Sequence, residues 1–145
     1  MSAYHLDAGH QPLFPFGFGL TYAGFHYEHL RLDRHELSIG ESLQVQVSLT
    51  HTGGLEATEV AQLYIRDLVG NVTRPVRELK GFQRVTLSPG ETRTVTFTLH
   101  TDDLGFYGRD DRWRVEPGEF ELWVGGDSEA TLGTRFRLLP ERVPA

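Results

Sequence analysis

Apolar and polar residues alternate one by one in several segments, and this pattern constrains the fold more than any other feature of the chain. In the clearest segment, the apolar positions are Leu43, Val45, Val47 and Leu49, and the residues between them are polar. Because successive side chains of a strand point to opposite faces, such a segment has one buried face and one exposed face. No segment has a sustained 3.6-residue apolar period, so the pattern predicts an all-β fold.

Turn residues separate the alternating segments about every ten residues. The clearest turns are Ser38-Ile39-Gly40-Glu41, Ser88-Pro89-Gly90-Glu91 and Glu116-Pro117-Gly118-Glu119. Seven or eight short strands with this spacing predict an antiparallel β-sandwich of the immunoglobulin-like kind, which needs about 100 residues. The chain has 145 residues, which suits one such domain and is too short for a (β/α)₈ barrel of about 250 residues.

Three local departures from simple alternation carry their own predictions. In residues 25–32 the apolar positions change parity, which predicts a bulge near Glu28 and His29. In residues 79–87, Gly81 predicts a bulge or a close backbone approach. Residues 102–107 are predicted to form either a short helical turn capped by Asp102 or a bent edge.

Residues 12–22, Pro-Leu-Phe-Pro-Phe-Gly-Phe-Gly-Leu-Thr-Tyr, fit neither a helix nor a regular strand. Proline fixes φ, glycine permits turns, and the aromatic side chains need an apolar surface to cover them. We interpret this segment, the aromatic tether, as the end of a preceding domain that packs against the next part of the chain. The alternative is an N-terminal arm that packs on its own domain. The expected interdomain packing residues are Leu13, Phe14, Phe16, Phe18, Leu20 and Tyr22.

Five further motifs come after the tether in a fixed order. They are EVAQLYI (59–65), RP followed by ELKGF (74–82), RVTLSPGE (84–91), DLGFY (103–107), and VEPGEF (115–120) running into VG at 124–125. Together with the tether, this series resembles the C-terminal part of family 3 glycoside hydrolases, the β-glucosidases and β-xylosidases. The resemblance covers roughly residues 4–139 and implies a fibronectin type III-like β-sandwich located after an α/β sandwich domain.

The resemblance also implies a division of the chain and a role for it. Residues 1–22 would be the tail of the preceding α/β domain and the tether, residues 23–140 the fibronectin type III-like domain, and residues 141–145 a frayed C-terminus. The implied role is a non-catalytic accessory domain that stabilises the catalytic-core domains of the same parent chain. In this family a retaining mechanism uses an Asp nucleophile on a barrel domain and, in β-glucosidases, a Glu acid/base on the α/β domain. Neither domain is present here, so no catalytic residue is expected.

The chain's own acidic and histidine residues predict no chemistry. The carboxylates considered all fall in expected turns or exposed strand positions: Asp102, Asp103, Asp110, Asp111, Glu116, Glu119 and Glu121. His26 and His29 are expected to face opposite sides of a strand, and no histidine pair suits a metal. No metal and no cofactor are therefore expected.

The net charge of −6 argues against a nucleic-acid partner. No apolar stretch approaches the ~18 residues of a membrane span, so we expect a soluble protein that is secreted, periplasmic or cytoplasmic.

Tyr64, Trp113 and Trp123 are the candidate carbohydrate contacts, because exposed aromatic rings stack on sugars. Trp123 is predicted to point away from the sandwich interior. These residues favour an alternative function, a carbohydrate-binding module that targets the enzyme to polysaccharide. The competing interpretation is that the tether or a neighbouring domain covers this outer face. A general adhesion or protein-interaction module is disfavoured, because such a domain has no reason to carry the six motifs.

Overall fold

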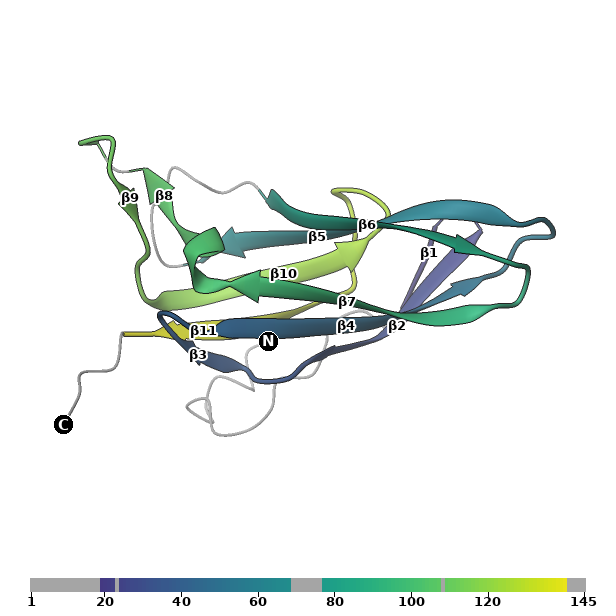
Figure 1. The fold of residues 1–145 in the computed structure, drawn as a ribbon, viewed down its shortest axis with the longest axis horizontal. Coiled ribbons are helices and arrows are strands. Elements are labelled where there is room, and N and C mark those ends of the chain that lie inside the picture. The colour runs from purple at the N-terminus through teal and green to yellow at the C-terminus, as the bar shows by residue number, and fades with distance from the viewer. Residues whose placement is uncertain (1–18, 23, 69–76, 108, 141–145) are drawn as a thin grey trace.

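The computed structural model describes residues 19–22, 24–68, 77–107 and 109–140. Its long strands run along the long axis of the molecule in two layers (Figure 1). One sheet has the strand order β1-β2-β4-β7 and the other has the order β3-β11-β10-β5-β6, while β8 and β9 form a separate hairpin. The prediction of an all-β sandwich is confirmed.

The number of long strands also agrees with the sequence. The four-stranded sheet contains β1 (Leu20–Tyr22), β2 (Phe25–Leu32), β4 (Ser42–His51) and β7 (Thr92–His100). The five-stranded sheet contains β3 (Glu36–Ser38), β11 (Gly133–Leu139), β10 (Gly118–Gly125), β5 (Ala57–Asp67) and β6 (Glu78–Leu87). A 3₁₀ turn, η2 (Thr101–Leu104), precedes the hairpin of β8 (Phe106–Tyr107) and β9 (Trp113–Arg114). The short strands β1, β3, β8 and β9 are the additions that alternation did not predict.

One short edge pair is an exception to the predicted antiparallel arrangement. Strand β3 runs parallel to β11, whereas the other described pairs are antiparallel. The reason is that the chain changes sheets after β2. Strand β2 pairs with β4 in one sheet, and β3 then pairs with β11 at the edge of the other.

The inner faces of the two sheets bury the residues that the alternation pointed inward. Their side chains are 0–4% exposed: Leu43, Val45, Val47, Leu49, Ala61, Leu63, Ile65, Val95, Phe97, Leu99, Phe120, Leu122, Val124, Phe136 and Leu138. The rings of Phe120 and Phe136 stack with centroids 5.3 Å apart. Burial of this apolar surface is the main stabilising contribution to the fold, at about 25 cal/mol per Å².

The bulge predicted in β2 is present, and it has an effect on two histidines. The register with β4 shifts between Glu28 and Arg31, and His29 has φ +57°. Because the bulge interrupts the alternation, both histidines reach Glu28: the Nε2 atoms of His26 and His29 lie 3.1 and 3.8 Å from its carboxylate oxygens. The prediction that His26 and His29 face opposite sides was therefore wrong.

The helical turn after β7 is also present, but its cap is not Asp102. His100 is the N-cap residue: its Nδ1 accepts a hydrogen bond from the backbone N–H of Asp102 at 3.0 Å. In return, the carboxylate of Asp103 accepts from the backbone N–H of His100 at 3.0 Å. The last residue of the strand thus supplies a capping box of the kind usually made by Ser or Thr with Glu.

Part of the predicted tether belongs to the sandwich. Residues 20–22 form the edge strand β1, antiparallel to β2, with Leu20 opposite Tyr27. Leu13, Phe14, Phe16 and Phe18 lie outside the described residues, as do residues 141–145. The domain boundary after residue 22 remains a prediction. Within the described residues, no helix has the length and apolar character needed to cross a membrane.

Candidate functional site

The tether enters the sandwich alongside His26 on β2. The Oγ1 atom of Thr21 and the Nδ1 atom of His26 are 2.9 Å apart. Gly19 has φ +146°, and a Cβ atom built there would lie 2.9 Å from Cε1 of His26. Glycine is needed at this position because it tolerates both the positive φ and the close approach of the imidazole ring. The path of the chain is therefore fixed where the tether becomes β1.

His51 holds the turn between β1 and β2. The ring is 4% exposed and stacks on Phe25 with centroids 4.8 Å apart. Its Nε2 donates to the carbonyl of Leu55, and its Nδ1 lies 3.1 Å from the carbonyl oxygen of Gly24. The hydrogen bond to the Leu55 carbonyl contributes most to raising the pKa of His51 above its usual value, and the bond to the Gly24 carbonyl contributes next. Burial of the ring acts in the opposite direction and lowers the pKa. The cation donates to both carbonyls; the neutral ring instead accepts from the N–H of Gly53 at 3.2 Å.

A raised pKa in the folded state makes stability depend on pH. The contribution of His51 should be complete below the unfolded pKa of about 6.5 and should be lost as the pH rises through the folded value. We therefore expect the difference in unfolding free energy between the native chain and a His51→Gln variant to shrink from pH 5.5 to pH 9. Urea unfolding at several pH values measures this free-energy difference. The control is His29→Gln, because His29 is exposed. A difference that does not vary with pH would contradict the expectation.

On the outer face of the five-stranded sheet, Tyr64 and Trp123 lie together but are covered. Their exposed fractions are 9% and 4%, and they pack with Ala130. The guanidinium of Arg77 lies 3.7 Å from the centroid of the Trp123 ring, and that of Arg66 lies 5.5 Å from it. These are cation–π distances. Trp123 points away from the interior as predicted, but it presents no open ring face to a sugar.

Hydrogen bonds and ion pairs hold this cover in place. Arg77 donates to the carbonyls of Ser128 and Ala130 at 2.9 and 2.6 Å, and burial lowers its pKa, with the nearby charge of Arg66 contributing. Glu121 accepts from Arg66 at 2.6 Å and from Arg135 at 3.4 Å. The outer face over β5, β10 and β11 is thus a fixed layer of arginine, aromatic and carboxylate side chains.

Trp113 lies elsewhere, on the β8–β9 hairpin that extends from one end of the sandwich in Figure 1. It is 47% exposed, and its neighbour Tyr107 is 67% exposed, with the rings 5.0 Å apart at 69°. The Nε1 of Trp113 donates to the carbonyl of Asp102 at 3.2 Å. A Cβ atom built on Gly105 would collide with the indole. One face of the hairpin's aromatic pair therefore packs on the chain, and the remainder is open to solvent.

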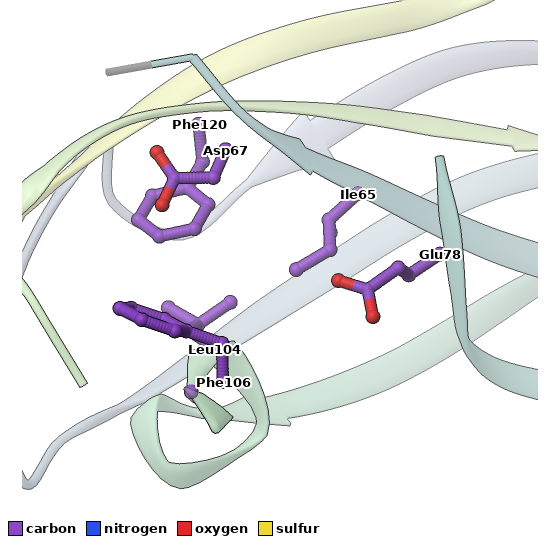
Figure 2. Close-up of a pocket in the computed structure, with 7 residues that line it drawn as sticks. Ile65, Asp67, Glu78, Leu104, Phe106 and Phe120 are labelled. Carbon is purple, nitrogen blue, oxygen red and sulfur yellow. The ribbon is translucent and has the colours of Figure 1, made fainter. Parts of the chain in front are cut away.

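A small pocket lies beside the hairpin at the same end. Figure 2 shows the carboxylates of Asp67 and Glu78 directed into it, across from Leu104 and Phe106. Ile65, Gly105 and Phe120 complete the lining. The cavity volume is about 10 Å³, which is about the room that a single water molecule needs. A pyranose ring does not fit inside it.

Sequence reasoning did not anticipate several of these residues. Asp67 continues the inward alternation of Ile65, so the strand pattern alone could have identified it. Glu78 faces the pocket because it lies opposite Ile65, and that register is not visible in the sequence. Glu59 shares the inward parity of β5 and is 8% exposed, and it accepts a hydrogen bond from Tyr27 at 2.8 Å. Among the described residues, no group of three histidine or carboxylate side chains could hold a metal ion.

Comparison with known proteins shows which domains and enzymes this fold resembles. Residues 59–128 match the family described as fibronectin type III-like domain. A solved β-glucosidase structure from Erythrobacter marinus superposes with a TM-score of 0.75 at 40% identity, covering 87% of this chain and 17% of that one. The sandwich is a fibronectin type III-like domain. It matches the C-terminal region of family 3 β-glucosidases and β-xylosidases, so the resemblance seen in the sequence is confirmed.

The relatives of this fibronectin type III-like domain are much longer chains. A β-xylosidase from Formosa agariphila is 45% identical over 119 residues, which is 82% of this chain and 16% of that protein. The periplasmic β-glucosidase of Salmonella typhimurium is 35% identical over 135 residues, which is 93% of this chain and 18% of that protein. The chain thus spans less than one fifth of the length of these relatives.

Proposed function

We propose that this fibronectin type III-like domain is a non-catalytic accessory domain of a family 3, β-glucosidase-like retaining glycosidase, and that it stabilises the neighbouring catalytic-core domains. The observation that carries the proposal is the edge strand β1. The aromatic tether ends in this strand, whose backbone pairs with β2, so the point at which the tether meets the sandwich is held in place by the sheet. The packing residues of the proposal are those of the tether, Leu13, Phe14, Phe16, Phe18, Leu20 and Tyr22.

Two further observations support this role. The matching region forms only part of much longer glycosidases, and the pocket beside the carboxylates of Asp67 and Glu78 has room for about one water molecule. A glycosidase site needs two carboxylates about 5–10 Å apart on either side of a sugar. The parent's catalytic residues would therefore belong to its other domains, and the partner of this domain is the rest of the same chain.

Truncation of the parent enzyme tests the proposal. Removal of residues 12–145 should lower the temperature at which the enzyme loses activity by about 10 °C or more, because a large apolar contact becomes exposed to water. Thermal inactivation of a nitrophenyl glycosidase assay, with and without the domain, measures the effect. Unchanged inactivation in the truncated enzyme would overturn the proposal.

The exposed pair Tyr107 and Trp113 favours a second candidate, a carbohydrate contact that targets the enzyme to polysaccharide. Of the three aromatics considered, Trp113 alone has an open surface, while Tyr64 and Trp123 are covered. On this alternative, insoluble cellulose, xylan or chitin should retain the domain and release a Trp113→Ala variant. Equal depletion of both proteins from solution would exclude Trp113 as the contact.

A further inference from the structure

Strand β6 carries two exposed apolar side chains that the sandwich itself does not bury. Phe82 is 61% exposed and Leu79 is 50% exposed. Phe82 lies opposite Gln62 on β5, and Leu79 lies opposite Tyr64. Directly opposed residues point to the same side of a sheet, and the Tyr64 hydroxyl donates to the Gln62 side chain at 2.5 Å on the outer face. Phe82 and Leu79 therefore both lie on the outer face of the five-stranded sheet.

A β-bulge is the reason that these two residues share a face. Residues three apart in a regular strand point to opposite sides, but the register between β5 and β6 shifts so that Lys80 is an additional residue. Gly81 then faces inward, where a Cβ atom would lie 3.3 Å from the Phe97 ring. The bulge and the glycine together let the core close while Leu79 and Phe82 project outward on the same side.

Three basic residues lie close to this apolar pair along the chain. Arg77, Lys80 and Arg84 lie within seven positions of each other along the strand region, and Arg84 lies opposite Val60 on the outer face. The single acidic residue in positions 77–87 is Glu78, whose carboxylate lines the pocket on the inner side. A basic strip on a chain of net charge −6 is complementary to an apolar surface bordered by carboxylates.

We propose that Leu79 and Phe82, with the rim of Arg77, Lys80 and Arg84, dock on the part of the parent chain that precedes residue 12. We call these five residues the β6 patch. The inference rests on the proposed function and adds the surface and its partner. The occupant is inferred from chain length, because this chain spans only 16–18% of its relatives. In a parent of that length, more than four fifths of the polypeptide is available to cover the patch.

The β6 patch lies far from the point at which the tether enters the sandwich. Strand β6 is an edge strand of its sheet and lies beside β7, since Gln83 donates to the carbonyl of Thr96. Strand β7 and strand β1 are at opposite edges of the other sheet. The tether enters at one edge and the β6 patch lies near the other, so a contact at the patch would stop the sandwich from rotating about its tether.

A double substitution tests the inference. Leu79→Ser with Phe82→Ser should leave the unfolding midpoint of the 145-residue chain nearly unchanged, because both side chains are exposed there. In the full parent enzyme, the same change should raise amide hydrogen exchange in residues 78–87 at least tenfold. Leu55→Ser is the matched control, since Leu55 is 82% exposed and lies outside the patch; it should alter neither protein. Equal exchange in the double variant and the unsubstituted parent would overturn the inference.

A second variant tests the same contact if the double variant folds poorly. Arg84→Glu retains an exposed polar side chain and should give the same increase in exchange, larger at low ionic strength. Failure of the inference is distinguishable from failure of the proposed function. If domain removal destabilises the parent while both variants leave exchange unchanged, the accessory role stands and the β6 patch is not its contact. If the unsubstituted 145-residue chain dimerises and the double variant does not, a second copy is the occupant and the inference is overturned.

Discussion

Phe136→Ala should destabilise the isolated chain by about 3–5 kcal/mol. The side chain is 1% exposed and stacks on Phe120 between the two sheets, so its removal leaves a cavity that the neighbouring strands cannot fill. Chemical unfolding monitored by tryptophan fluorescence measures the loss, and the thermal midpoint should fall by about 10 °C or more. The control is Leu55→Ala, which should change the free energy of unfolding by less than about 0.5 kcal/mol. Similar small effects from both substitutions would contradict the described core.

Trp123→Ala should cost about 3–5 kcal/mol as well, although its side chain lies on the outer face. The ring is 4% exposed beneath Arg77, and truncation would leave the guanidinium without its aromatic partner. Trp113→Ala is the matched control, because that ring is 47% exposed; we expect it to cost about 1 kcal/mol. Equal losses from the two tryptophans, measured by urea unfolding, would show that the arginine cover does not form.

The fold could be predicted because its determinants are local. Alternation identified each long strand and, except in residues 79–87, its inward face, and the change of parity in residues 25–32 located the bulge at His29. Gly81 was expected to mark either a bulge or a close backbone approach; the structure shows the bulge, next to Lys80, and the group that lies close to the glycine is the side chain of Phe97. Such features depend on the side-chain period of a single strand, which the sequence displays directly.

The outer face could not be predicted because its determinants are pairs of distant residues. The alternation correctly placed Trp123 opposite the core face, but it gave no sign that Arg77, 46 positions earlier in the sequence, covers the ring. The exposure of Phe82 and Leu79 on one face depends on a register shift relative to β5. The cap on η2 was assigned to Asp102 for a similar reason, since the contribution of His100 requires its position at the end of β7.

The inner and outer faces of the sandwich have different roles. The inner face supplies the stability of the domain, and the arginine layer fixes one region of the outer face. Outside this layer, exposed apolar side chains lie on the β8–β9 hairpin and, within the β6 patch, at Leu79 and Phe82. Of these, the β6 patch combines exposed apolar side chains with a basic rim, which suits contact with a folded neighbour better than contact with a neutral polysaccharide.

Association between the two separated parts of the parent enzyme tests the central claim most directly. The parent truncated before residue 12 and the chain of residues 12–145 would be mixed and titrated by calorimetry. Stabilisation of a neighbouring domain requires contact, so we predict a complex with a Kd of about 10 µM or tighter, weakened at least tenfold by the Leu79→Ser and Phe82→Ser substitutions. Two folded parts that do not associate at about 100 µM would contradict the accessory role.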